Sequence, residues 1–223
     1  MNMKVNYIDN TIDLKNSVNV IEIENKNYFY RFVNDLYSIY NIGYSDNISF
    51  FKKDEEKNLN GKIKIFINFF DFQFDSKKYI NDLSKYVNEN IDESDRNNLF
   101  NLYNKIIKLY KRILNNIDLP LNIEENVTID NLTKLVKLSI NYNNELLDNL
   151  LLLIDLEKAL NTKNILIFVN LKQYLNKTEL IEFYKYAVYN EIKLLLIDSQ
   201  TYGTTVEYEK KLIIDEDLDE FML

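Results

Sequence analysis

The sequence of 223 residues contains no cysteine and no histidine, and it has only three glycines and one proline. Without cysteine, the chain forms no disulfide, thiolate metal site or cysteine nucleophile, which fits a reducing compartment. Without histidine, it lacks the usual general base, so Ser–His and Cys–His catalysis are excluded. Any bound metal is therefore expected to be an oxygen-preferring cation such as calcium or magnesium.

Long hydrophobic runs are also missing. No apolar stretch approaches the ~20 residues that a membrane helix needs. The stretch 145–160, ELLDNLLLLIDLEKAL, is interrupted by Asp148, Asp155 and Glu157. The first residues, MNMKVNYIDNTIDL, contain no apolar segment typical of a signal peptide. We therefore predict a soluble, cytoplasmic protein that makes no membrane contact.

The scarcity of glycine bears on nucleotide binding. A phosphate-binding loop needs glycines, then Lys and Ser or Thr at the start of a helix. Gly61-Lys62 is the only such pair, but no glycine stands five residues before it and Ile63 replaces the hydroxyl. The first predicted strand–helix junction, 23–30, contains no glycine either. These absences argue against nucleotide hydrolysis and dinucleotide binding.

The pattern that is present indicates an α/β protein. The apolar run Ile165 to Val169 is typical of a central parallel strand, and Asn176 is a candidate cap for the helix that follows. That helix, between two buried strands, requires a right-handed crossover. Strands are predicted at 18–25, 48–52, 62–70, 164–170, 192–198 and 211–217. Further helices are predicted at 26–41, 76–91, 92–117, 128–139 and 144–161.

The helices from 75 to 161 follow one another without alternating strands. We therefore predict a discontinuous α/β head domain of residues 1–74 and 162–223, with residues 75–161 as a helical insertion. Asn170 follows a buried strand, where a nucleotide-dependent enzyme often places an acidic metal ligand. We favour the simpler interpretation that Asn170 closes a turn.

Five stretches, in order, resemble the accessory spacer-acquisition protein of type II-A CRISPR–Cas systems in its short form. They are 20–37, 48–56, 70–83, 164–187 and 213–223. The most specific is NILIFVNLKQYLNKTELIEFYKYA (164–187), an apolar strand ending in Val-Asn before a helix that starts with Lys-Thr-Glu-Leu. The second is the terminal IIDEDLDEFML (213–223).

The resemblance implies an α/β head similar to a degenerate P-loop NTPase sheet, with a helical leg inserted in the chain. It implies a ring-shaped homotetramer that encloses double-stranded DNA, loads at free ends and is steadied by calcium. No catalytic activity is expected. The implied partners are the adaptation integrase and the effector nuclease of the same system.

Binding to DNA without sequence preference needs several cations facing phosphates, although the net charge is −8. A negative net charge does not exclude a local basic surface, because screening by salt limits the reach of each charge to ~8–10 Å. The alternative is that the basic candidates are ordinary solvent-exposed residues of helices and strands. The candidates are Lys52, Lys53, Lys57, Lys62, Lys64, Lys77, Lys78, Lys105, Lys108, Arg112, Lys134 and Lys137.

For calcium, the acidic loop of the family corresponds to residues 116–130. Its oxygen-bearing side chains suit a calcium shell, and the alternative is an ordinary polar loop between helices. The candidate ligands are Asp118, Asn122, Glu124, Glu125, Asn126 and Asp130.

The leading functional hypothesis is thus a non-catalytic clamp on DNA ends used in spacer acquisition. One alternative is an interaction scaffold that gathers adaptation proteins without binding DNA. A residual phosphotransferase is the third and weakest hypothesis.

Overall fold

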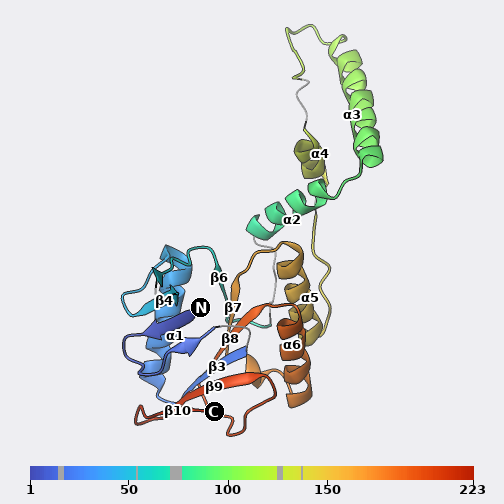
Figure 1. Cartoon of the computed structure of the whole chain (residues 1–223). Helices are drawn as coiled ribbons and strands as arrows, with labels where there is room; N and C mark the ends of the chain where they lie inside the picture. The colour runs from blue at the N-terminus through green and yellow to red at the C-terminus, as the bar shows by residue number, and fades with distance from the viewer. Residues whose placement is uncertain (15–17, 54, 71–76, 125–127, 137) are drawn as a thin grey trace. The chain divides into compact units, whose positions relative to one another are not determined.

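A computed structural model of the chain describes residues 1–14, 18–53, 55–70, 77–124, 128–136 and 138–223 (Figure 1). The chain forms two compact units, which are described separately. The first comprises Met1–Phe72 and Tyr142–Leu223, and the second comprises Gln73–Asn141.

The first unit is built around a six-stranded sheet with the strand order β10-β9-β3-β8-β7-β6. All neighbouring strands pair in parallel except β10, which is antiparallel to β9. The parallel β7–β8 pair confirms the predicted crossover through the helix between them. The strands are β3 (Val18–Ile23), β6 (Ile63–Phe66), β7 (Ile165–Val169), β8 (Lys193–Asp198), β9 (Glu209–Ile214) and β10 (Glu220–Met222).

A second, antiparallel sheet has the order β2-β1-β4-β5. Its strands are β1 (Asn2–Val5), β2 (Ile12–Asp13), β4 (Ile48–Lys52) and β5 (Glu55–Glu56). The pattern of residues 1–14 did not predict β1 and β2. Met3 and Val5 are buried while Lys4 is exposed, so the alternation that holds β1 against the core is only three residues long.

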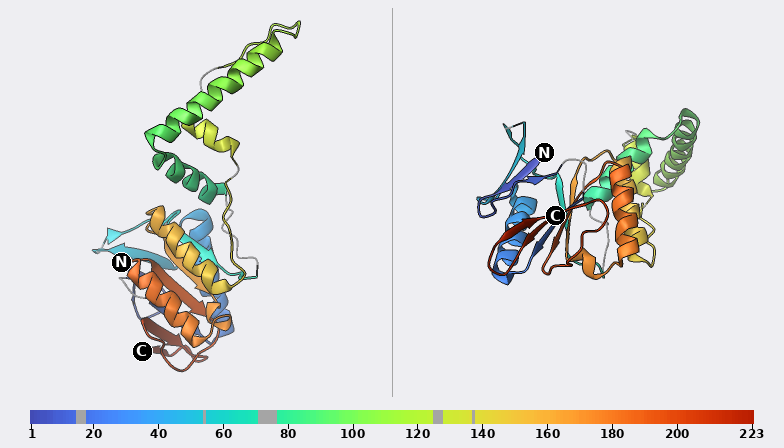
Figure 2. Two further views of the ribbon diagram at one scale, coloured as in Figure 1. Left: turned by 90° about the vertical axis from the view of Figure 1, so that its right-hand side faces the viewer. Right: turned by 60° about the horizontal axis from the view of Figure 1, so that its bottom comes forward.

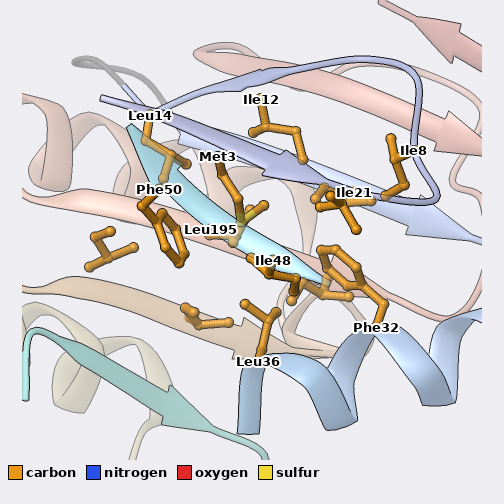
Figure 3. Close-up of a cluster of buried hydrophobic side chains, with 14 of the residues drawn as sticks. Met3, Ile8, Ile12, Leu14, Ile21, Phe32, Leu36, Ile48, Phe50 and Leu195 are labelled. Carbon is orange, nitrogen blue, oxygen red and sulfur yellow. The ribbon is translucent and has the colours of Figure 1, made fainter. Parts of the chain in front are cut away.

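The six-stranded sheet lies between two layers (Figure 2). Helix α1 (Lys26–Ile42) and the small sheet cover one face, where Phe32 and Leu36 of α1 pack with Met3, Ile48 and Phe50 (Figure 3). Helices α5 (Leu146–Ala159) and α6 (Lys177–Tyr189) cover the other face and contact each other. The mixed α/β class predicted from the sequence is confirmed.

Local signals set the ends of the helices as expected. Gly43 ends α1 with a left-handed φ of 88°, and its N–H donates to the carbonyl of Ile39 at 2.9 Å. Asn176 caps α6 in a capping box with Glu179. Asn170 closes the turn after β7: its φ is 60°, and its side chain accepts the N–H of Ser199 at 2.8 Å.

The second unit is helical. It contains α2 (Lys77–Glu89), α3 (Glu93–Leu114) and α4 (Ile129–Leu135), and α4 contacts both of the others. Asp92 caps α3, and Thr128 caps α4. No described residue of α3 is buried.

The second unit spans 73–141, whereas the insertion was predicted to span 75–161, so the larger difference is at its carboxyl-terminal boundary. Residues 142–161 were predicted in the insertion but lie in the first unit. The reason is α5, whose residues Leu150, Leu153 and Ile154 are fully buried and which packs beside α6. Among the described helices, none combines the length and apolar character that a membrane crossing requires.

Candidate nucleic-acid interface

Six lysines surround one hollow of about 860 Å³ in the first unit. No acidic residue contributes to its lining within the part of the chain that the structure describes. The hollow lies where the amino ends of β6, β7 and β8 meet the β4–β5 hairpin. The lysines, which come from separate stretches of the sequence, are Lys52, Lys53, Lys57, Lys62, Lys163 and Lys193.

The parallel sheet brings three of these lysines together. Lys193 is the first residue of β8, while Lys62 directly precedes β6 and Lys163 lies two residues before β7. Because neighbouring parallel strands start at the same edge of a sheet, their first residues lie side by side. The N–H of Ile165 donates to the carbonyl of Lys62 at 2.9 Å and fixes this register.

The hairpin of the small sheet supplies the other three. Lys52 ends β4 and Lys53 follows it, and the N–H of Lys57 donates to the carbonyl of Phe50 at 2.7 Å, which turns the chain back toward the hollow. Lys53 and Lys163 have φ values of 53° and 54°. Residues other than Gly and Asn rarely adopt this left-handed backbone conformation. Residues that do adopt it are often found at functional sites.

The hollow carries a positive charge that the protein itself leaves largely uncompensated. Lys57 pairs with Glu55, with 2.5 Å between the ammonium and the carboxylate. The other five lysines form no ion pair with any carboxylate among the described residues. Burial lowers the pKa of Lys193 below its ordinary value, and the charge of Lys52 lowers it further. A bound anion would relieve this repulsion.

Four of the lysines predicted to bind DNA, Lys52, Lys53, Lys57 and Lys62, thus lie around one hollow. Sequence reasoning missed Lys163 and Lys193, because neither belongs to a local basic cluster. A usable signal was present, since a lysine stands at or just before the start of each of three parallel strands.

Lys64 was also predicted to bind DNA, but the structure gives it another role. Its ammonium lies 2.7 Å from the carboxylate of Glu157 in α5. Asn164 also donates to that carboxylate, at 2.8 Å. Lys62 lies in the turn before β6 and not in the strand, so the alternation of a strand does not relate the two side chains. Lys64 is therefore engaged within the protein.

The remaining basic candidates belong to the second unit. Lys105, Lys108 and Arg112 are exposed along α3. Lys137 lies outside the described residues, and so do the side chains of three further candidates, Lys77, Lys78 and Lys134.

The predicted calcium loop is described only in part. Asp118, Asn122 and Glu124 are exposed, and the side chain of Asn122 accepts the N–H of Ile123 at 2.9 Å. Glu125, Asn126 and the side chain of Asp130 lie outside the described residues. Within the described part of the chain, no group of three or more acidic side chains is placed to hold a metal. The calcium site stays a prediction.

A second charged feature, which the sequence did not predict, lies inside the first unit. Lys172 lies 3.0 Å from Glu22 and 2.9 Å from Glu209, and Lys211 lies 2.9 Å from Glu22. All four side chains are at most 1% exposed. We call these four residues the buried ionic cluster. Burial acts to lower the pKa of Lys172, but the hydrogen bonds and charges of Glu209 and Glu22 outweigh it and raise the pKa above its ordinary value.

Glu22 lies near the carboxyl end of β3 and Lys172 follows β7, at the edge where open α/β sheets usually bind ligands, whereas Glu209 and Lys211 lie in the first half of β9. Here the charges satisfy one another. Tyr184 adds a hydrogen bond to Glu209 at 3.1 Å, and the N–H of Tyr202 donates to Glu22 at 3.1 Å. The cluster therefore joins β3, β9, α6 and the segment after β7, and its lysines are not available to an external phosphate.

A comparison with known families identifies the family of the chain. The family model of the CRISPR-associated protein Cas_Csn2 matches residues 40–218. The chain belongs to this family. The Cas_Csn2 match spans all six lysines of the hollow and confirms the resemblance to the type II-A accessory protein. Membership of Cas_Csn2 implies a role in CRISPR adaptation.

The fold is also similar to a solved structure, the crystal structure of Stu0660 of Streptococcus thermophilus. The TM-score is 0.65 at 15% sequence identity, and the match covers 100% of this chain and 76% of that chain. At this identity the likeness shows a shared fold. No curated protein matches the sequence.

Proposed function

We propose that this Cas_Csn2 chain is a non-catalytic, sequence-independent double-stranded DNA end-binding protein that acts as a ring-shaped homotetramer in spacer acquisition. One observation carries the proposal: six lysines converge on one hollow with no acidic residue in its described lining. The head would descend from a P-loop NTPase type of sheet that has lost its phosphate loop. Its partners would be the adaptation integrase and the effector nuclease of the same system.

The net charge of −8 does not oppose this proposal. Screening in physiological salt limits the reach of each surface charge to ~8 Å, so a phosphate at the hollow responds mainly to the lysines around it. A fourfold ring would repeat those six lysines about one axis. Many weak contacts with the DNA backbone would then add to a useful affinity without any contact to bases.

A charge reversal at the hollow tests DNA binding. K52E, K53E, K62E and K163E together are expected to reduce affinity for linear duplex by at least ~100-fold, since each lost phosphate contact removes counterion release. Wild-type protein should bind linear duplex, should ignore closed circles of the same sequence, and should lose affinity steeply with salt, by ~0.9 in log affinity per phosphate contacted for each unit of log salt. Gel shift and fluorescence anisotropy measure these properties.

The matched control reverses four exposed lysines away from the hollow, Lys26, Lys177, Lys185 and Lys210. This control variant changes the net charge by the same amount as the variant at the hollow, and it should retain DNA binding. Equal loss in both variants would show an effect of net charge alone. Wild-type protein that bound neither linear nor circular DNA would favour the interaction scaffold. Charge reversal at Lys105, Lys108 and Arg112 tests whether α3 contributes to DNA binding.

Self-association is supported by an apolar stripe on α3. Leu102, Ile106, Leu109 and Ile113 are 45–56% exposed and, with Leu99, follow the alternating spacing of three and four residues that is typical of paired helices. An exposed stripe of this kind usually marks a protein interface. We propose that it contacts other copies of this chain in the tetramer.

The variant I106D/L109D is therefore expected to dissociate the tetramer, because it would place two charges in an apolar contact. N101D/N104D is the matched control, since it adds the same charge to another face of the same helix. Analytical ultracentrifugation with and without calcium measures both variants, and it also tests calcium as a stabiliser of the ring. An unchanged tetramer in I106D/L109D would remove α3 from the interface.

A further inference from the structure

The hollow has the size of a site for a small ligand. Its volume of about 860 Å³ falls within the ~300–1,000 Å³ of typical small-molecule sites. A cube of that volume has an edge of roughly 9.5 Å, less than the ~12 Å width of the DNA major groove alone. A double helix would therefore have to pass across the mouth of the hollow, while a strand end or a small anion would fit inside it.

The charge of the hollow also favours a compact anion with more than one negative charge. Five lysines without a carboxylate partner converge on it, and its described lining offers no acidic residue. A phosphodiester within a DNA strand carries a single negative charge. A phosphate monoester carries about −1.5 to −2 at neutral pH and offers three acceptor oxygens. The monoester therefore gains more from several converging ammonium groups.

The way the lysines are held indicates a site that is formed in advance. Lys62 and Lys193 are fixed by the starts of β6 and β8, and Lys163 lies in the turn that leads into β7. Lys53 and Lys163 keep left-handed backbone conformations at the hollow. Burial and the charge of Lys52 lower the pKa of Lys193, which agrees with a cation held in place without a counter-ion.

We infer that the hollow binds a compact, multiply charged phosphate group, and that its source is the terminal 5′-phosphate of a DNA strand. The inference rests on the proposed DNA binding and explains how a protein without base contacts would distinguish an end from the interior of a duplex. A free oligophosphate offers the same chemistry and is the alternative source.

The experiment compares short blunt duplexes of one sequence that carry either 5′-phosphates or 5′-hydroxyls. The tetrameric full chain is expected to bind the phosphorylated duplex roughly tenfold more tightly, the effect of about one charge-assisted hydrogen bond. K53Q/K62Q/K163Q should bind both duplexes equally. K26Q/K177Q/K185Q is the control, since it removes the same charge from α1 and α6 and should keep the tenfold preference.

A second arm titrates inorganic tripolyphosphate by calorimetry into wild-type protein and K53Q/K62Q/K163Q. Binding that is lost in the variant, together with a preference for 5′-phosphate ends, supports the inference as stated. Binding of tripolyphosphate without any end preference overturns the strand end as the source and assigns the hollow to a free oligophosphate. Equal affinity for both duplexes without tripolyphosphate binding overturns the inference but leaves DNA binding intact, whereas no affinity for any duplex refutes the proposed function itself.

Discussion

Lys211→Met is expected to lower the free energy of unfolding by about 3–5 kcal/mol, the usual cost of removing one partner from a buried ion pair. Lys211 is fully buried in β9, and its ammonium lies 2.9 Å from Glu22 and 3.8 Å from Glu209. It also donates to the carbonyl of Thr204 at 3.0 Å. The substitution would leave two buried carboxylates to share the single charge of Lys172.

The neighbouring residue provides the control. Lys210 is exposed on the same strand, so Lys210→Met should change stability by less than about 0.5 kcal/mol. The double variant E22Q/K211M restores the charge balance with Lys172 and Glu209, so it should be less destabilised than the two single variants added together. Urea unfolding monitored by circular dichroism measures the stability of K210M, K211M, E22Q and E22Q/K211M. Equal effects of Lys210→Met and Lys211→Met would show that the buried ionic cluster does not stabilise the fold.

Asp198 is expected to contribute stability at pH 4 that is lost as pH rises to about 7. Burial raises the pKa of Asp198 from its ordinary 3.8 to about 7, with smaller opposing and supporting effects from Lys172 and Glu22. Its side chain is fully buried at the end of β8, and neither carboxylate oxygen has a hydrogen-bond partner among the described residues. The groups that act on it are Lys172 after β7, Glu22 of β3, and Glu209 of β9.

Burial is the main reason that this carboxyl keeps a proton, and the buried ionic cluster offers no spare positive charge to offset it. Lys172 and Lys211 balance Glu22 and Glu209, so an ionised Asp198 would add an uncompensated negative charge. Below pH 3.8 both the folded and the unfolded states carry the proton, and between 3.8 and about 7 only the folded state retains it. Across that window the unfolding free energy should fall by about 1.4 kcal/mol per pH unit, or about 4 kcal/mol in total.

Asp198→Asn should remove this slope, because asparagine cannot ionise. Asp217→Asn is the control, since Asp217 is exposed and its side chain accepts no hydrogen bond from the described residues. The absence of histidine makes the measurement clean, as no imidazole titrates between pH 5 and 8. Urea unfolding at a series of pH values measures the slope. An identical slope in wild type and Asp198→Asn would show that Asp198 is not the titrating group.

Local order was predictable where the signal lies within one stretch of sequence. Five consecutive apolar residues from Ile165 fixed β7 as a buried parallel strand, and Asn176 with Glu179 fixed the start of the next helix. Gly43 similarly fixed the end of α1. These features depend on periodicity and capping, which act between residues at most a few positions apart.

Pairings between distant residues were not predictable in the same way. β1 and β2 are too short to show a pattern and exist because β1 pairs with β4. α5 resembles the helices before it, and only its packing beside α6 assigns it to the first unit. Glu22 lies in a stretch predicted as a strand, but no local pattern indicates that the structure buries it between Lys172 and Lys211.

By itself, the sequence determined which reactions are chemically available, where the helices and the longer strands lie, and that the sheet has no phosphate loop, because these follow from residue types and short spacings. Only the tertiary structure decided where the charges go. The starts of parallel strands, far apart in the chain, meet at one sheet edge, so Lys62, Lys163 and Lys193 surround one hollow. Lys64, two residues from Lys62, is instead paired with Glu157 of α5, because Lys64 lies within β6 whereas Lys62 lies in the turn before it.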